Sequence, residues 1–114
     1  MDKPISRKVN LVIYKVKEGK DAAFLELLKL HWPTLDAAGL VTSEPVKIWR
    51  GKNIRSTSAG TSWVEMFSWK DEKSPDVAHQ MPEVMAVWEP MGNIMEGYNG
   101  TTSPIAIASL EPIS

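Results

Sequence analysis

The sequence predicts an α+β domain of the ferredoxin-like type, with the element order β-α-β-β-α-β. Segments rich in β-branched and aromatic residues occur at four places along the chain. Two segments with apolar residues every three or four positions follow the first and third of them. This order places two helices on one face of a four-stranded antiparallel sheet. A length of 114 residues fits one domain, which we expect to span residues 1–114.

The first strand is predicted over residues 8–17, after a short disordered arm over 1–7. Apolar residues occupy both of its faces: Val9, Leu11 and Ile13 on one, and Val12, Tyr14 and Val16 beside Asn10 on the other. A sheet with one wet face should be polar on that face. We therefore expect a second layer to cover the face that the helices leave open.

The first helix is predicted after a turn over 18–21, and Gly39 is the expected stop. Its apolar face repeats at helical spacing and includes one histidine: Phe24, Leu27, Leu28, His31 and Leu35. Pro33 should kink or divide this helix, because proline removes a backbone donor and clashes with the preceding turn.

The second and third strands are predicted over 44–50 and 61–69, with a polar loop over 52–60 between them. A helix should then start at Ser74, whose hydroxyl caps it before Pro75.

Pro82 is expected to start a second helical segment, and Pro90 to disturb its end. The core face of this region is predicted from spacings of three and four: Val77, Met81, Val84, Trp88, Met91 and Met95. A loop over 97–104 leads to the last strand, 105–110, which has the small and β-branched residues of a packed interior strand.

Composition excludes several classes of partner and chemistry. The 13 Lys and Arg residues nearly balance the 14 Asp and Glu residues, which gives no electrostatic reason to expect nucleic acid or an anionic membrane. With no cysteine there is no thiol catalysis and no disulfide. The first residues have no apolar signal core, and we expect a cytoplasmic protein.

The aromatic third strand suggests two ways to cover the open face of the sheet. Trp63, Phe67 and Trp69 superficially suit an RNA-recognition surface, on which bases stack. However, Glu65 interrupts the aromatics and the strand lacks the basic and glycine-aromatic residues of that motif. We favour the second solution, in which two copies of the chain press their sheets together.

The chain resembles the dimeric α/β-barrel superfamily, particularly its antibiotic-biosynthesis-monooxygenase-like branch. The resemblance covers residues 8–110 and rests on four motifs: Val-Ile-Tyr-Lys-Val-Lys-Glu-Gly-Lys (12–20), Ala-Ala-Gly (37–39), Phe-Ser-Trp-Lys-Asp-Glu-Lys (67–73), and Ala-His-Gln-Met-Pro-Glu-Val (78–84) followed by Trp88. It implies a homodimer that forms a dimeric α/β barrel. Its members include cofactor-free oxygenases, haem-degrading enzymes, isomerases and stress-induced proteins.

Two residues are the candidate catalytic groups. Many relatives keep a histidine near the position of His79, where it can donate or accept a proton near neutral pH. Glu65 lies among aromatic residues, so its pKa should rise unless a cation or hydrogen-bond donors compensate. We expect Glu65 to contact His79 or Arg50. The alternative is that both residues only support the fold.

The candidate ligand-binding residues are Asn10, Tyr14, Trp69 and Trp88. One of the alternative linings of the barrel lumen combines Asn10 and Tyr14 with alternate residues of the third strand: Ser62, Val64, Met66 and Ser68. Such side chains suit an apolar pocket that holds an electron-rich molecule and excludes water. The same residues would also serve as core in a filled barrel.

No cofactor or metal is expected. Haem-degrading relatives use an Asn, Trp and His set, but the spacing from Asn10 to the next glycine differs, and Trp88 stands near where their histidine would align. Two histidines, with no convincing ligand spacing to an acidic residue, make a dedicated metal site improbable.

Two functions remain open from the sequence. One is an enzyme, of the cofactor-free monooxygenase kind, acting on a small apolar or aromatic molecule in the barrel. The other is a non-catalytic dimeric domain that binds a small hydrophobic molecule or serves in stress response. A solvent-accessible pocket at Asn10 or Tyr14 would favour the enzyme.

Overall fold

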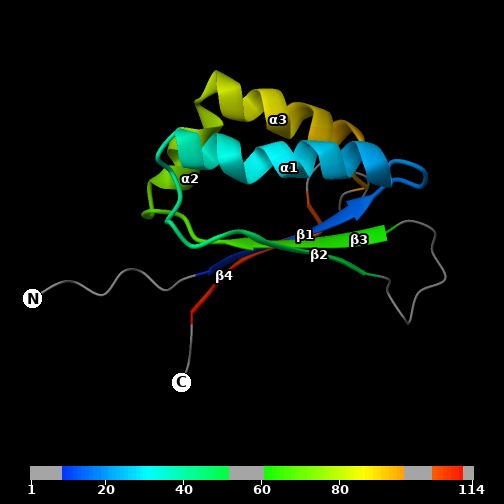
Figure 1. Ribbon diagram of the computed structural model, residues 1–114, viewed down its shortest axis with the longest axis horizontal. Coiled ribbons are helices and arrows are strands. Elements are labelled where there is room, and N and C mark those ends of the chain that lie inside the picture. Colours follow the sequence, from blue (N-terminus) through cyan, green and yellow to red (C-terminus); the bar gives the residue numbers. More distant parts are fainter. Residues whose placement is uncertain (1–8, 52–60, 97–103, 112–114) are drawn as a thin grey trace, which may run out of the picture.

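The computed structural model has the predicted α+β, ferredoxin-like fold and describes residues 9–51, 61–96 and 104–111 (Figure 1). Its elements are β1 (Val9–Val16), α1 (Asp21–Ala37), β2 (Lys47–Gly51), β3 (Thr61–Phe67), α2 (Ser74–His79), α3 (Pro82–Asn93) and β4 (Ala106–Leu110). The arm predicted over 1–7 and the loop over 52–60 lie outside the described residues, as does the loop over 97–104 except for Pro104.

The four strands form one antiparallel sheet in the order β2-β3-β1-β4, with the helices on one side (Figure 1). The last strand was predicted as an interior strand, and this is wrong. Within the described residues β4 pairs only with β1, so β4 lies at the edge of the sheet. Its residue Ile107 is 65% exposed.

The register between β1 and β3 decides which side chains face the helices. Val12 pairs with Glu65 and Tyr14 with Trp63, and paired residues share a face of the sheet. These four side chains are buried beneath the helices. Ser62, Val64 and Met66 alternate with them and lie on the opposite face, so the lining expected from the sequence, which joined them to Asn10 and Tyr14, is wrong.

Helix α1 is a single helix from Asp21 to Ala37, so Pro33 does not divide it, which was one of the two effects predicted. Burial of its apolar face against the sheet holds the helix together across the missing hydrogen bond. Its end has the expected glycine: Gly39 has φ +75°, its N–H donates to the Asp36 carbonyl, and the Leu40 N–H donates to the Leu35 carbonyl. These two bonds form a Schellman motif.

The second helical region is divided as predicted, because α2 ends at His79 and α3 begins at Pro82. Pro90 lies inside α3, which continues to Asn93. Val84, Met91 and Met95 belong to the core, whereas Val77 is 45% exposed and was wrongly placed on the core face. The break between α2 and α3 turns Val77 away, because one helical repeat no longer runs through both segments.

The opposite face of the sheet is apolar and no helix of the described ranges covers it. Leu11, Ile13, Val64 and Met66 are half-buried there, and Trp49 is 51% exposed.

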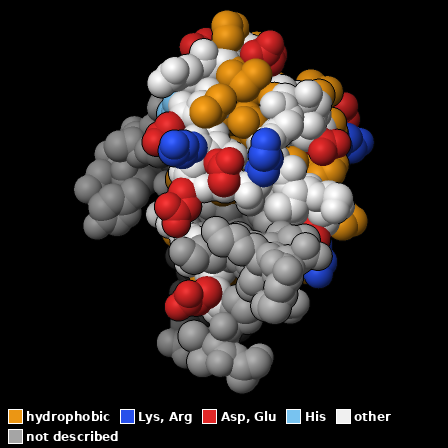
Figure 2. Space-filling model, turned by 90° about the vertical axis from the view of Figure 1, so that its left-hand side faces the viewer, with side chains coloured by type: hydrophobic (Ala, Val, Ile, Leu, Met, Phe, Trp, Pro, Cys, Tyr) orange, Lys and Arg blue, Asp and Glu red, His pale blue; other side chains and the backbone are white. Residues whose placement is uncertain are grey.

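Charged side chains of both signs are interspersed on the end of the molecule that Figure 2 shows, with no basic stripe across that view. Among the described residues, no helix is long and apolar enough to cross a bilayer.

Candidate active site between the sheet and the helices

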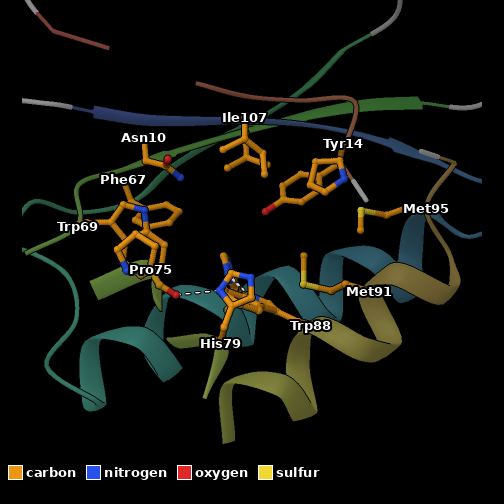
Figure 3. Close-up of a pocket in the computed structure, with 13 residues that line it drawn as sticks. Asn10, Tyr14, Phe67, Trp69, Pro75, His79, Trp88, Met91, Met95 and Ile107 are labelled. Atoms are coloured by element: carbon orange, nitrogen blue, oxygen red, sulfur yellow. Dashed lines mark hydrogen bonds between the residues drawn. The ribbon is translucent and has the colours of Figure 1, made fainter. Parts of the chain in front are cut away.

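A cavity of about 390 Å³ lies between the helix-facing side of the sheet and α2 and α3 (Figure 3). This volume is within the range of small-molecule sites, about 300–1,000 Å³. Apolar side chains make much of its wall: Val12, Phe67, Pro75, Met91, Met95, Pro104 and Ile107. Side chains that can hydrogen-bond complete it: Asn10, Tyr14, His31, Trp69, His79 and Trp88.

Glu65 is fully buried behind this cavity, and both of its carboxylate oxygens have a partner. The Tyr14 hydroxyl donates to Oε1 over 2.7 Å. Nδ1 of His31, on α1, lies 2.8 Å from Oε2. A buried carboxylate is tolerated when hydrogen bonds replace its hydration, and these two bonds do so.

Trp88 determines which ring nitrogen of His31 carries the proton. Its indole N–H, which can only donate, lies 2.7 Å from Nε2 of His31. Nε2 must therefore accept and carries no proton, so Nδ1 carries the proton of a neutral ring and donates it to Glu65. A chain of hydrogen bonds thus connects Trp88 on α3 with Tyr14 on β1, through α1 and β3.

Tyr14 remains protonated at this place. Burial raises the pKa of its phenol well above the usual value, and the negative charge of Glu65 and its hydrogen bond raise the pKa further. Tyr14 therefore acts as a hydrogen-bond donor to Glu65 over the whole physiological pH range.

The partners predicted for Glu65 are wrong. Tyr14 and His31 contact it, whereas the guanidinium carbon of Arg50 lies 5.7 Å from the centre of the Trp63 ring. His79 is hydrogen-bonded instead to the Pro75 carbonyl. The pairing of β3 with β1 and the packing of α1 over Glu65 bring other donors closer to its carboxylate.

His79 is the last residue of α2, is exposed, and lines the cavity. Its Nδ1 lies 2.8 Å from the carbonyl oxygen of Pro75, which can only accept, so Nδ1 carries a proton. In the neutral ring Nε2 then has a free lone pair, and within the described residues nothing hydrogen-bonds to it. The ring packs edge-on against Trp88 at 4.8 Å between centroids, which further limits its rotation.

Asp71 orders the start of the helix that carries His79. Its Oδ1 accepts hydrogen bonds from the backbone N–H groups of Lys73 and Ser74 and from the Ser74 hydroxyl. The bond from the Ser74 hydroxyl is the main reason why the pKa of Asp71 is lowered. The sequence prediction assigned the cap to Ser74. This is wrong: the N-cap residue is Lys73, without a side-chain capping bond, and the Ser74 hydroxyl donates to Asp71 instead.

The remaining candidates, Asn10 and Trp69, stand at the outer end of the cavity. Trp69 packs edge-on against Phe67 at 5.0 Å and is half-buried. Both Asn10 and Trp69 also border a second cavity of about 430 Å³, whose wall includes Lys70, Asp71 and Glu72. This outer cavity therefore adjoins the inner one and is more polar.

The structure brings together five of the six residues predicted for the site, since Asn10, Tyr14, Trp69, His79 and Trp88 all line one cavity (Figure 3). The sixth, Glu65, lies behind Tyr14. Sequence reasoning placed His31 only on the apolar face of α1. A buried histidine on such a face needs a hydrogen-bond partner, and this was a signal that a polar side chain faces it.

No metal-binding cluster of three or more His, Asp or Glu side chains occurs within the described residues.

Comparisons with known proteins give structural likeness without sequence likeness. No family model matches the chain, and no curated protein matches it. A candidate antibiotic biosynthesis monooxygenase from Nitrosomonas europaea is 17% identical, with a TM-score of 0.58 over 83% of this chain and 85% of that chain.

Two further solved structures are similar. A candidate antibiotic biosynthesis monooxygenase from Chloroflexus aurantiacus is 8% identical, with a TM-score of 0.61 over 94% of this chain and 93% of that chain. An ethyl tert-butyl ether D (EthD) family protein from Bacillus halodurans is 17% identical, with a TM-score of 0.55 over 93% of this chain and 99% of that chain. The chain therefore has the ferredoxin-like α+β fold of antibiotic-biosynthesis-monooxygenase-like and EthD-family proteins.

Proposed function

We propose that this protein is a monooxygenase-like enzyme that oxidises a small electron-rich aromatic molecule with O₂ in the cavity between sheet and helices. The observation that carries this proposal is the Nε2 lone pair of His79, which has no partner among the described residues and lies at the wall of an aromatic, largely apolar cavity. Two structural neighbours described as candidate monooxygenases support the reaction class. The cavity wall is largely apolar and His79 is held in place beside it, which favours proton removal by a fixed base.

The simplest reaction of this class needs no added reductant. For 1-naphthol as a model substrate, the neutral compound binds, and its hydroxyl proton passes to water as the ring carbon para to it bonds to O₂. The terminal peroxide oxygen takes up that proton. His79 then removes the hydrogen on this ring carbon as a proton. A C=O bond forms, the O–O bond breaks, and hydroxide leaves to join the proton as water. The balance is 1-naphthol plus O₂ to 1,4-naphthoquinone plus water, with all four electrons supplied by the substrate.

The other site residues hold the substrate in this scheme. Trp69 and Trp88 flank an aromatic ring, and the Asn10 amide hydrogen-bonds to its oxygen. Glu65 does not touch the substrate. It is a positioning residue that acts through Tyr14 and His31.

Oxygen uptake tests the proposal. With 1-naphthol we expect the protein to consume O₂ and form 1,4-naphthoquinone in equal amounts, measured by an oxygen electrode and by absorbance. Ile107→Trp should reduce this rate at least tenfold, because Ile107 lines the cavity and the larger ring fills it. Ile107 is exposed, so the thermal unfolding temperature should stay the same. Binding of 1-naphthol without O₂ uptake would leave a non-catalytic binding domain and reject the enzyme.

We also propose that the protein works as a homodimer, in which a second copy covers the apolar sheet face away from the helices. Leu11, Ile13, Val64 and Met66 form the centre of this face, and exposed Trp49 extends it. A contiguous apolar area of this kind on a small domain marks an interface. The same patch on both copies would make a two-fold symmetric contact.

Light scattering tests the dimer. We expect a mass of about 25 kDa, twice the 12.7 kDa of one chain. Val64→Glu at the centre of the face should give a 12.7 kDa monomer, because it would bury an unpaired charge. The matched control is Leu30→Glu on α1, where the leucine is already 55% exposed, and it should keep the larger mass. A wild-type mass of one chain would refute the dimer.

A further inference from the structure

We infer that the cavity selects neutral aromatic ligands that present an O–H or N–H donor to Tyr14, and discriminates against ligands that offer only acceptors or a negative charge there. This inference rests on the proposed function, because it concerns the ligand of the same cavity. It names the substrate class as hydroxy-aromatic or amino-aromatic compounds and gives Tyr14 the role of a specificity-determining residue.

A count of protons along the hydrogen-bond chain leads to this selectivity. Trp88 has one N–H and gives it to Nε2 of His31. His31 therefore has one proton, on Nδ1, and gives it to Glu65. The only proton of the Tyr14 hydroxyl also goes to Glu65. The Tyr14 oxygen keeps lone pairs and no proton for a ligand, so it can only accept.

The direction of the two hydrogen bonds of His31 is fixed by its neighbours, Trp88 and Glu65. An indole N–H can donate but cannot accept, and an ionised carboxylate can accept but cannot donate. His31 lies between them and has no alternative tautomer that satisfies both neighbours. Rotation of the Tyr14 hydroxyl toward a ligand acceptor would leave one oxygen of fully buried Glu65 without its donor, which is unfavourable.

Tyr14 is in the right place to touch a ligand. It lines the cavity, and Figure 3 shows its hydroxyl on the sheet side, opposite the helices that carry His79 and Trp88. A site built to bind a substrate hydroxyl rejects analogues without it strongly, because its own polar group then stays unpaired.

The negative charge of Glu65 also favours neutral ligands. Glu65 is a buried carboxylate behind Tyr14, and no Lys or Arg lines the inner cavity among the described residues. A carboxylate ligand would place a second negative charge near the first with no cation to compensate. Neutral ligands do not meet this repulsion.

A ligand series under anaerobic conditions tests the inference by calorimetry. We expect wild-type protein to bind 1-naphthol, a donor, at least tenfold more tightly than 1,4-naphthoquinone, which has acceptors only. We expect 1-naphthoate to bind more weakly than either. The weak binding of the quinone would also help the product of the proposed reaction to leave.

Glu65→Gln should change this preference by reversing one hydrogen bond. His31 still donates from Nδ1, so the glutamine must turn its carbonyl oxygen toward His31 and its NH₂ group toward Tyr14. Tyr14 then accepts from Gln and its own proton is free to donate to the ligand. We expect the ratio of quinone to naphthol dissociation constants to fall at least tenfold. Glu89→Gln, at an exposed position beside Trp88 in the sequence, removes the same charge and should leave the ratio unchanged.

The possible results separate this inference from the proposed function. If wild-type protein binds 1-naphthol and 1,4-naphthoquinone equally, the inference is wrong while ligand binding in the cavity stands. If Glu65→Gln keeps the wild-type ratio, the hydrogen-bond direction does not determine selectivity. If none of the compounds binds, the proposed function fails and this inference with it. Should Glu65→Gln not fold, the wild-type series decides alone.

Discussion

Replacement of Glu65 by alanine is expected to lower the free energy of unfolding by about 4 kcal/mol. The carboxylate accepts hydrogen bonds from Tyr14 and His31, and both donors are buried. Each buried donor left without a partner costs about 1–3 kcal/mol, and the space left by the side chain adds a cavity cost. Most single substitutions cost less, so this change should stand out.

Urea unfolding monitored by tryptophan fluorescence measures this effect, with all variants at one protein concentration because association would add to stability. Glu65→Gln has nearly the same size and can pair with both Tyr14 and His31, so it should lose much less stability than Glu65→Ala. Glu89→Ala, at an exposed position, should stay within about 0.5 kcal/mol of wild type. A loss of less than about 1 kcal/mol for Glu65→Ala would mean that the hydrogen-bond chain does not form in solution.

The fold was predictable because its signals are local. Alternation marked β3, helical spacing marked α1, and Pro82 marked the start of α3 within the chain itself. The apolar surroundings of Glu65 were also predictable from its strand, because Trp63 and Phe67 lie on the same face. These features depend on residues a few positions apart, and one sequence contains that information.

The partners of Glu65 were not predictable in the same way. His31 comes from a helix 34 residues earlier in the chain and Tyr14 from a strand 51 residues earlier. Their approach depends on how α1 is rotated over the sheet and on which residue of β1 pairs with Glu65. Spacing along one sequence does not determine either, so His79 and Arg50 were equally reasonable partners.

The face of β1 that lines the cavity was also ambiguous from the sequence. Both faces of this strand are apolar, so alternation alone does not show which one the helices cover. The register, in which Tyr14 pairs with Trp63, resolves it and places Asn10 and Tyr14 in the cavity beneath the helices.

Trp63 and Trp88 both have hydrogen-bonding roles. Trp63 donates from Nε1 to Asp21 at the start of α1 over 3.1 Å, and Trp88 donates to His31. Tryptophan combines a large apolar surface with one polar handle, so it can serve as core and as an orienting donor together. Trp88 does both, since it also lines the cavity.

His79→Ala is expected to lower kcat for O₂-dependent oxidation of 1-naphthol by a factor of about 10²–10⁴, the usual contribution of a positioned acid or base. The loss should appear in kcat with little change in KM, because His79 removes a proton in the reaction and provides only part of the cavity wall. The side chain is exposed, so the unfolding free energy should change little. Oxygen-electrode kinetics and urea unfolding measure the two quantities.

Two comparisons separate a proton-transfer role of His79 from a structural one. Gln80→Ala changes the exposed neighbour, which does not line the cavity, and should keep the wild-type kcat. Added imidazole should restore part of the activity of His79→Ala, because the lost ring leaves a space beside Trp88 where a free base can lie. A merely structural histidine would not be replaced in this way, since the bond from Nδ1 to the Pro75 carbonyl orders only the end of α2. A fall in kcat of less than threefold would remove His79 from the reaction.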